Sequence, residues 1–260
     1  LALVEEAAAL GQERLQAAAL VDGGARGHHE AVDVVRDERA GLARGRAARV
    51  ALIGSAGTME AMPARRLHLV RHAEVDNPGR VLYGRMPGFV LSERGHRMAE
   101  LAAEHLAAGQ SARSVVRLAA SPLERAQQSA QPWADAFALD IRTERRIIEP
   151  TNRFEGKTFE ASGALRHPSA WPLLRNPFRP SWGEPYRAIA QRVIAAMEDA
   201  WDELAESDDD GDIVFVSHQS PIWMAHLAIA GERLWHDPRS RRCQLSSITS
   251  FARVEDRFVE

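Results

Sequence analysis

The sequence has very little cysteine, because Cys243 is the only one in 260 residues. One thiol cannot close a disulfide within the chain, and it cannot form a zinc site built from several cysteines. A chain with so little cysteine suits a reducing compartment, so we expect a cytoplasmic protein.

The sequence also lacks long apolar runs and an excess of positive charge. No run approaches the roughly 18 apolar residues that a membrane-spanning helix needs, and the apolar run at 50–53 is too short for the core of a signal peptide unless residues 54–57 are counted with it. The formal net charge is -3, so no overall basic field would attract nucleic acid or an acidic membrane. We therefore expect a soluble protein with neither partner, while the oligomeric state stays open.

The chain divides into two unequal parts. Residues 1–62 are rich in Ala, Arg and Gly and contain no Trp, Tyr or Phe. Such a segment has few large apolar side chains whose burial could offset the entropy lost on ordering. We predict that residues 1–62 are an extension that is poorly ordered or outside the native domain, with a functional tail as the alternative. Residues 63–260 then form the domain.

Within the domain, short apolar runs alternate with helical patterns. Strands are predicted at 67–70, 114–121, 213–218 and 246–254. Helices are predicted at 92–108 with Ser92 as N-cap, at 123–139 with a kink or break at Pro132, at 184–205, and from Pro221 to Gly231. Apolar strands alternating with helices indicate a parallel sheet covered on both faces. The predicted fold class is α/β, a three-layer α/β/α sandwich with a mostly parallel central sheet.

Charged and polar side chains follow three of the predicted strands. Arg71 and His72 follow the first, Ser121 and then Arg125 follow the second, and His218 follows the third. Because ligands of open α/β sheets bind beyond the carboxyl ends of the strands, we expect these side chains to meet at one edge. Such a cluster of cations calls for a compact dianion, and guanidinium groups match phosphate oxygens.

The cluster also indicates a chemistry. It holds no carboxylate pair, and two histidines are too few for a typical zinc site, so we expect neither a metal nor a cofactor. A neutral imidazole is a competent nucleophile for phosphoryl transfer, and the arginines would stabilise the transferred group without magnesium. A general acid would still be needed to protonate the leaving alcohol.

Several segments resemble one known family. "LVRHAE" resembles the "RHG" signature of the histidine phosphatase (phosphoglycerate mutase-like) superfamily, with Ala73 in place of the glycine. "LSERG", "ASPLERAQQSA", "WGEPYRAIAQRV" and "FVSHQSP" are similar to further family segments, in the family's order, from about residue 66 to the C-terminus. The resemblance implies a phosphoglycerate mutase-like fold.

The resemblance also implies roles for the residues of the cluster. His72 would be the phosphorylated nucleophile. Arg71, Arg125 and His218 would bind the phosphate, with His218 also part of the catalytic set. Asn77 would contact the phosphate as well, although it lies one position earlier than in relatives.

The acid/base carboxylate of the family corresponds to the stretch "IIEPTNRFEGKTFE". Glu149 is the preferred candidate, because a strand end could deliver it after the apolar pair Ile147 and Ile148. Burial there would raise its pKa and keep it protonated as an acid. The spacing to Gly156 is one residue shorter than in the family pattern, so Glu155 is a rival.

Three functions are compatible with this sequence. The preferred one is a phosphatase that hydrolyses a small phosphomonoester through a phosphohistidine, and the alternatives are a phosphoglycerate-type mutase and a non-catalytic protein that binds a phosphorylated ligand. The short segment at 161–181 favours the phosphatase, because the mutases of the family use a longer insertion. An anionic substrate tail could be recognised by Tyr83, Arg85, Arg153, Arg175 and Arg179. "RSRRC" at 239–243 is interpreted as a solvent-facing basic patch.

Overall fold

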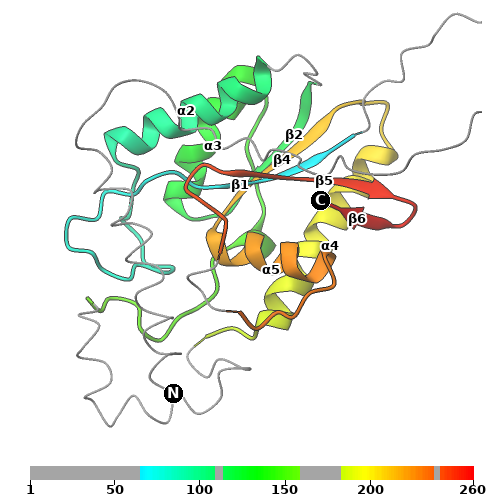
Figure 1. The fold of residues 1–260 in the computed structure, drawn as a ribbon. Coiled ribbons are helices and arrows are strands. Elements are labelled where there is room, and N and C mark those ends of the chain that lie inside the picture. The colour runs from blue at the N-terminus through cyan, green and yellow to red at the C-terminus, as the bar shows by residue number, and fades with distance from the viewer. Residues whose placement is uncertain (1–64, 109–113, 159–182, 237–240) are drawn as a thin grey trace, which may run out of the picture.

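A six-stranded sheet forms the centre of the computed structural model, which describes residues 65–108, 114–158, 183–236 and 241–260 (Figure 1). The strand order is β3-β2-β4-β1-β5-β6. The strands are β1 (Leu67–Arg71), β2 (Val115–Ala120), β3 (Arg142–Thr143), β4 (Asp212–Ser217), β5 (Ile248–Val254) and β6 (Arg257–Val259). Strands β1 to β4 pair in parallel, and β5 and β6 pair antiparallel. The predicted extension at 1–62 lies outside the described residues.

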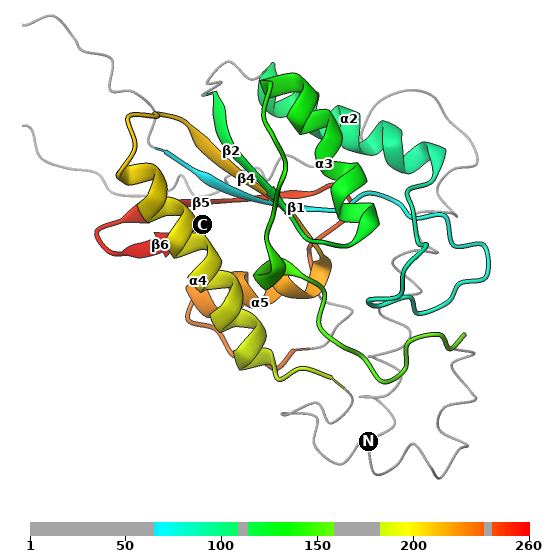
Figure 2. The same cartoon turned by 180° about the vertical axis from the view of Figure 1, so that it is seen from behind.

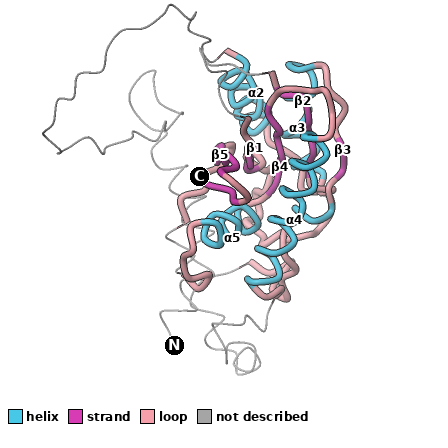
Figure 3. The backbone as a smooth tube through the Cα atoms, turned by 90° about the vertical axis from the view of Figure 1, so that its right-hand side faces the viewer, coloured by secondary structure: helices cyan, strands magenta, loops and turns pink. Residues whose placement is uncertain are grey.

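Helices cover both faces of this sheet. They are α2 (Glu93–Ala107), α3 (Glu124–Phe137), α4 (Tyr186–Ala205) and α5 (Gln219–Ile229), together with the short 3-10 helix η1 (Arg145–Ile147). Helices α2 and α3 lie on one face, and α4 and α5 lie on the other (Figures 1 and 2). The edge-on view shows the strands between the two helical layers (Figure 3). The predicted three-layer α/β/α sandwich with a mostly parallel sheet is confirmed.

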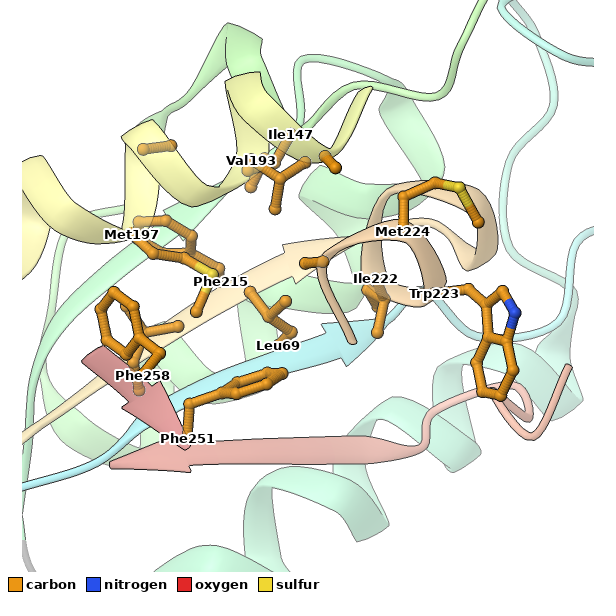
Figure 4. Packing of buried hydrophobic residues seen from close by; sticks show 14 of the residues in the cluster. Leu69, Ile147, Val193, Met197, Phe215, Ile222, Trp223, Met224, Phe251 and Phe258 are labelled. Atoms are coloured by element: carbon orange, nitrogen blue, oxygen red, sulfur yellow. The ribbon is translucent and has the colours of Figure 1, made fainter. Parts of the chain in front are cut away.

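The apolar strands follow from this layering, because successive side chains of a strand point to opposite faces. Leu69 and Phe215 face α4 and α5, where Val193 and Met197 pack on them (Figure 4). The neighbouring strand residues face α2 and α3 and join a second core cluster, whose largest member is Trp133. Both faces of β1 and β4 are therefore buried, as expected for central parallel strands.

Two helices differ from the prediction at a proline. Helix α3 continues through Pro132 to Phe137, so the predicted break is wrong, and the alternative of a kink at Pro132 stays a prediction. Burial of Trp133 and Ala134 holds the turn after the proline, and this burial offsets the hydrogen bond that proline cannot donate. Helix α5 begins at Gln219, before Pro221, so the proline occupies the first turn, where a missing N–H costs nothing.

The predicted N-terminus of α2 is confirmed. The Ser92 Oγ accepts a hydrogen bond from the Gly95 N–H at 2.9 Å and donates one to the Glu74 carboxylate at 2.8 Å. Glycine is required at 95, because an added Cβ would lie 2.0 Å from the Glu74 carbonyl oxygen. Among the described residues, no helix combines the length and the apolar character needed to cross a membrane.

Candidate functional site

The ends of β1, β2 and β4 meet because these three strands are neighbours in the sheet. The imidazole rings of His72 and His218 lie 5.1 Å apart, and the His218 Nε2 lies 2.7 Å from the Ser121 Oγ. Arg71 and Arg125 are buried with them. The structure therefore brings together the residues that the sequence placed at one sheet edge.

The protonation of His72 can be assigned from its surroundings. Its Nδ1 lies 2.8 Å from the Ala73 carbonyl oxygen, which can only accept, so Nδ1 carries the proton and Nε2 keeps its lone pair. Burial, and then the charges of Arg125 and Arg71, hold the pKa of His72 well below its ordinary value. At neutral pH the ring is neutral, and its Nε2 has the lone pair that a nucleophile needs.

Ala73, which stands in the place of the family's glycine, is fully buried. Its backbone N–H donates to the Ser129 Oγ at 3.0 Å, and its side chain packs with Leu91 and Ala99. The methyl group thus fills a small apolar cluster beneath α2. This packing explains how alanine is accommodated at this position.

Main-chain carbonyl groups fix the two guanidinium groups. Arg71 donates from Nη1 to the Cys243 carbonyl at 2.7 Å, and Arg125 donates from Nη2 to the Gly84 carbonyl at 2.7 Å. The Tyr83 ring lies 4.7 Å from the Arg125 guanidinium carbon, in a cation–π arrangement. The Nε atoms of both arginines are buried and lack a hydrogen-bond partner among the described residues. Buried donors of this kind require an acceptor, and a phosphate oxygen is a suitable one.

The His218 ring is neutral for the same reasons as His72, because burial and then the charges of its neighbours lower its pKa well below the ordinary value. We assign the Ser121 hydroxyl as the donor to Nε2, which leaves the proton on Nδ1. That Nδ1 is buried, has no hydrogen bond in the described structure, and lies 4.0 Å from the Glu149 Oε2. His218 therefore offers an N–H toward the space between Glu149 and the cluster.

Glu149 is delivered by the 3-10 helix η1 and the residue that follows it, not by a strand end as the sequence suggested. Burial raises the pKa of the Glu149 carboxyl above its ordinary value, although the charges of Arg125, Arg241 and Arg71 act in the opposite direction. A carboxyl group with a raised pKa next to a cationic cluster is suited to donate a proton.

Three successive carbonyl groups before and at Glu149 are held by side chains of other elements. The Ile147 carbonyl accepts from the Ser217 Oγ at 2.7 Å, the Ile148 carbonyl accepts from Arg192 Nη2 at 2.7 Å, and the Glu149 carbonyl accepts from Arg85 Nε at 2.5 Å. The backbone that carries the carboxylate is thereby fixed.

Glu184 joins the two arginines of this arrangement. Its Oε1 lies 2.8 Å from Arg192 Nε, and its Oε2 lies 3.7 Å from Arg85 Nη2. Arg85, which the sequence suggested for an anionic tail, therefore holds the Glu149 backbone, and its contact with a substrate stays a prediction. Sequence reasoning missed Glu184 and Arg192, although both lie in the segment "WGEPYRAIAQRV" that resembles the family.

The rival carboxylate Glu155 has a different environment. Its Oε1 accepts hydrogen bonds from the backbone N–H groups of Arg85 at 3.0 Å and Asn152 at 3.2 Å. Gly84 has φ +39°, and a Cβ there would lie 2.2 Å from this carboxylate. Glu155 thus joins two loops, and the geometry favours Glu149 as the acid.

The remaining candidates have varied positions. Asn77 donates from Nδ2 to the Val81 carbonyl at 2.9 Å and accepts from the Val81 N–H at 3.0 Å, so it closes a turn, and its phosphate contact stays a prediction. Arg153 is exposed. Arg175 and Arg179 lie outside the described residues. Within the described ranges, no group of three or more His, Cys, Asp or Glu side chains could hold a metal ion.

One interpretation of the sequence is wrong for Arg241. The basic segment at 239–243 was interpreted as facing solvent, but Arg241 and Cys243 are buried, whereas Arg242 between them is exposed; residues 239 and 240 lie outside the described residues. The alternation of inward and outward residues next to a buried cysteine is the signal that could have distinguished Arg241 from its neighbour.

Comparisons with known proteins agree with this geometry. The family model of the histidine phosphatase superfamily (branch 1) matches residues 67–259. Uncharacterized protein Rv0525 of Mycobacterium tuberculosis is 46% identical over 195 residues, which are 75% of this chain and 93% of that protein. A 2,3-bisphosphoglycerate-dependent phosphoglycerate mutase of Thermoplasma acidophilum is 29% identical over 59% of this chain and 70% of its own.

A solved structure shares the fold. It is the mycobacterial glucosyl-3-phosphoglycerate phosphatase Rv2419c in complex with VO3, with a TM-score of 0.59 and 25% identity over 75% of this chain and 95% of that one. The matched segment contains every described residue of the cluster at the strand ends. On sequence, fold and site together, this chain belongs to the histidine phosphatase superfamily.

Proposed function

We propose that the protein is a phosphatase that hydrolyses a small phosphomonoester through a phosphohistidine intermediate on His72. The observation that carries this proposal is the state of His72, a buried neutral imidazole whose Nδ1 is fixed and whose Nε2 is free. Two guanidinium groups with unpartnered Nε atoms lie in the same cluster. This combination supplies a nucleophile and the donors that a transferred phosphoryl group needs.

In the first step, the His72 Nε2 attacks phosphorus and the bond from phosphorus to the alcohol oxygen breaks. The electron pair of that bond goes to the alcohol oxygen, which takes the proton of the Glu149 carboxyl. Arg71, Arg125 and the His218 Nδ1–H donate to the phosphoryl oxygens as charge develops. The phosphorylated ring keeps its Nδ1–H hydrogen bond to the Ala73 carbonyl, which stabilises the positive charge the ring acquires.

In the second step, the Glu149 carboxylate takes a proton from a water molecule, and the water oxygen attacks phosphorus. The bond from phosphorus to Nε2 breaks, its electron pair returns to the imidazole, and inorganic phosphate leaves. Glu149 is then protonated and His72 is neutral, so the starting state is restored. No step requires a metal ion.

The proposal is tested by assaying phosphate release from a panel of phosphomonoesters, including p-nitrophenyl phosphate, in the presence of EDTA. We expect release of free phosphate without a bisphosphate primer. Isomerisation of a phosphoglycerate that needs a bisphosphate primer and yields no net phosphate would instead identify a mutase. The segment at 161–181, whose length favoured the phosphatase, lies outside the described residues, so this assay decides between the two. Binding of phosphate without turnover of any ester would identify a non-catalytic binder.

The role of the Glu184 network gives a further prediction. Glu184→Gln removes the charge that holds Arg192 and Arg85 while keeping the size of the side chain. We expect alcohol release from glycerol 3-phosphate in the first turnover to slow about 10-fold, because misplacement of the Glu149 carboxyl weakens proton donation. Release of p-nitrophenolate, which leaves without a proton, should slow much less.

Glu203→Gln is the matched control, because Glu203 is exposed and pairs with Arg142 on the surface. This variant should behave as wild type with both substrates. An equal loss on the two substrates in Glu184→Gln, or a lower Tm with unchanged rates, would contradict a positioning role.

A further inference from the structure

Arg241 is a buried cation whose partner is a neutral side chain. It is 8% exposed, and its Nε donates to the His236 Nε2 at 2.8 Å. The His236 Nδ1 lies 2.8 Å from the Leu234 carbonyl and therefore carries the ring's proton, which leaves Nε2 as an acceptor. Among the described residues, the hydrogen bond from Nε is the only one that Arg241 makes, and no carboxylate lies within ion-pair distance of its terminal nitrogens, although the charge of Glu149 is near enough to influence it.

The backbone next to Arg241 contacts residues of the candidate site. Two residues later, the Cys243 carbonyl accepts from Arg71 Nη1 at 2.7 Å and from Gln219 Nε2 at 3.4 Å. Arg71 directly precedes His72, and Gln219 directly follows His218. The segment that carries Arg241 is therefore tied to the phosphate-binding end of β1 and to the N-terminus of α5.

Aromatic rings form the surroundings of the Arg241–His236 pair. The His236 ring centroid lies 5.7 Å from that of Tyr186 and 6.0 Å from that of Trp223. Tyr186 begins α4 and Trp223 lies in α5, so helices from the same face of the sheet hold His236 in place. The orientation of the Arg241 guanidinium is consequently set before any ligand arrives.

A buried guanidinium that has no anionic partner among the described residues is costly. Its charge is close enough to lower the pKa of Glu149, yet the Glu149 carboxyl is the proton donor of the proposed reaction and is neutral when it acts. The transferred phosphoryl group already has Arg71, Arg125 and His218. The third cation is thus available to another part of the substrate.

We propose that Arg241 is a specificity-determining residue, which binds a second anionic group of the substrate while the phosphate to be transferred lies between Arg71, Arg125 and His72. This inference rests on the proposed phosphatase function and names its substrate class, a phosphomonoester whose alcohol part carries a carboxylate or a second phosphate. Carboxylate and phosphate oxygens both accept hydrogen bonds from the paired N–H groups of a guanidinium.

The experiment compares pairs of substrates that differ only in the second anionic group. 3-Phosphoglycerate is compared with glycerol 3-phosphate for a carboxylate, and propane-1,3-diol bisphosphate with its monophosphate for a second phosphate. In the wild-type protein we expect kcat/KM to favour the anionic member of at least one pair by about 10- to 100-fold. The pair that shows the preference identifies the source of the charge.

Arg241→Gln should abolish this preference, mainly through a higher KM for the anionic member. Arg241→Lys keeps the positive charge but loses the paired N–H donors of the guanidinium, so it should keep part of the preference. The lysine variant also tests the inference if Arg241→Gln does not fold. Arg242→Gln is the matched control, because Arg242 is the exposed neighbour and its substitution should leave the ratio unchanged. The inference would be overturned if wild-type protein showed no preference, or if Arg241→Gln left the ratio of the two kcat/KM values unchanged. It would also be overturned if Arg241→Gln lowered kcat/KM equally for both substrates of a pair, because Arg241 would then act on Glu149 or on the transferred phosphate.

p-Nitrophenyl phosphate separates failure of this inference from failure of the proposed function, since it carries no second anionic group. Its turnover by wild-type protein without any preference within the pairs would overturn the inference alone. If wild-type protein hydrolyses no ester, the proposed function fails, and the same pairs are compared by the shift in Tm that each compound produces. A larger shift with the anionic member, lost in Arg241→Gln, would still support Arg241 as an anion-binding residue, and equal shifts would overturn it.

Discussion

Replacing His72 with alanine is expected to lower kcat for p-nitrophenyl phosphate by about 10⁴-fold or more, because the variant has no group to receive the phosphoryl group. The substitution removes Nε2 and leaves the guanidinium groups of Arg71 and Arg125 fixed by their main-chain carbonyls. Phosphate should therefore still bind, and the loss should appear in kcat. The measurement is steady-state release of p-nitrophenolate, with phosphate inhibition as the readout of binding.

The same substitution should abolish the covalent intermediate. Wild-type protein mixed rapidly with substrate and quenched should carry phosphate that is stable in alkali and labile in acid, which is the behaviour of a phosphohistidine. His96→Ala is the control, because His96 is exposed on α2 and its loss should change neither turnover nor labelling. Labelled protein in the His72→Ala variant, or retained turnover, would mean that another residue is the nucleophile.

The pH dependence provides a second check on His72. The nucleophile is active when neutral, and its pKa is well below the ordinary value because of burial and the two arginines. The first turnover of p-nitrophenyl phosphate does not need Glu149, so its rate should persist as the pH falls through 6.5, the ordinary value for histidine, and decline only below it. A decline centred near or above the ordinary value would mean that the imidazole is not in this environment.

The strand-end residues could be predicted from the sequence because they depend on backbone topology alone. An apolar strand between helices ends at the same edge as its parallel neighbours, so Arg71, His72 and His218 meet whatever the details of their side chains. Arg125 follows because it lies in the first turn of the helix after β2. The close approach of these side chains also requires that β2, β4 and β1 be neighbours in the sheet, and the sequence pattern did not predict this order.

The residues that hold Glu149 could not be predicted in the same way. Ser217, Arg192 and Arg85 donate to its segment from β4, from α4 and from the loop before α2, and these contacts depend on side-chain direction across long stretches of sequence. Arg241 was misjudged because only the folded chain shows the segment after α5 returning to Arg71. The local sequence pattern predicts where a residue lies along a helix or strand. Whether a long charged side chain such as that of Arg241 is buried depends on the segments that pack over it.

Glu149→Gln is expected to separate the two chemical steps. With glycerol 3-phosphate, an alkyl phosphate whose alcohol needs a proton to leave, the first turnover should slow by about 10²- to 10⁴-fold. With p-nitrophenyl phosphate, the first release of p-nitrophenolate should be nearly as fast as in wild type, because that leaving group departs as an anion. Steady-state turnover of the second substrate should still fall, since water must then attack the phosphohistidine without its base. The result is a burst of p-nitrophenolate and accumulation of phosphorylated His72.

The pH profile of the first turnover sharpens this test. A general acid acts when protonated, so the rate with glycerol 3-phosphate falls as the pH rises through the pKa of Glu149. Burial raises that pKa, which moves the fall to higher pH than an ordinary glutamate would give. In Glu149→Gln this part of the profile should be flat.

Glu155→Gln is the matched comparison that decides between the two carboxylates. Glu155 accepts hydrogen bonds from the backbone of Arg85 and Asn152, so its substitution should lower Tm by weakening the contact between two loops. It should leave the difference between the alkyl and the p-nitrophenyl substrates as in wild type. If Glu155→Gln instead slows only the alkyl phosphate and gives the burst, Glu155 is the acid, and the hydrogen bonds that it makes in this structure must be released during turnover.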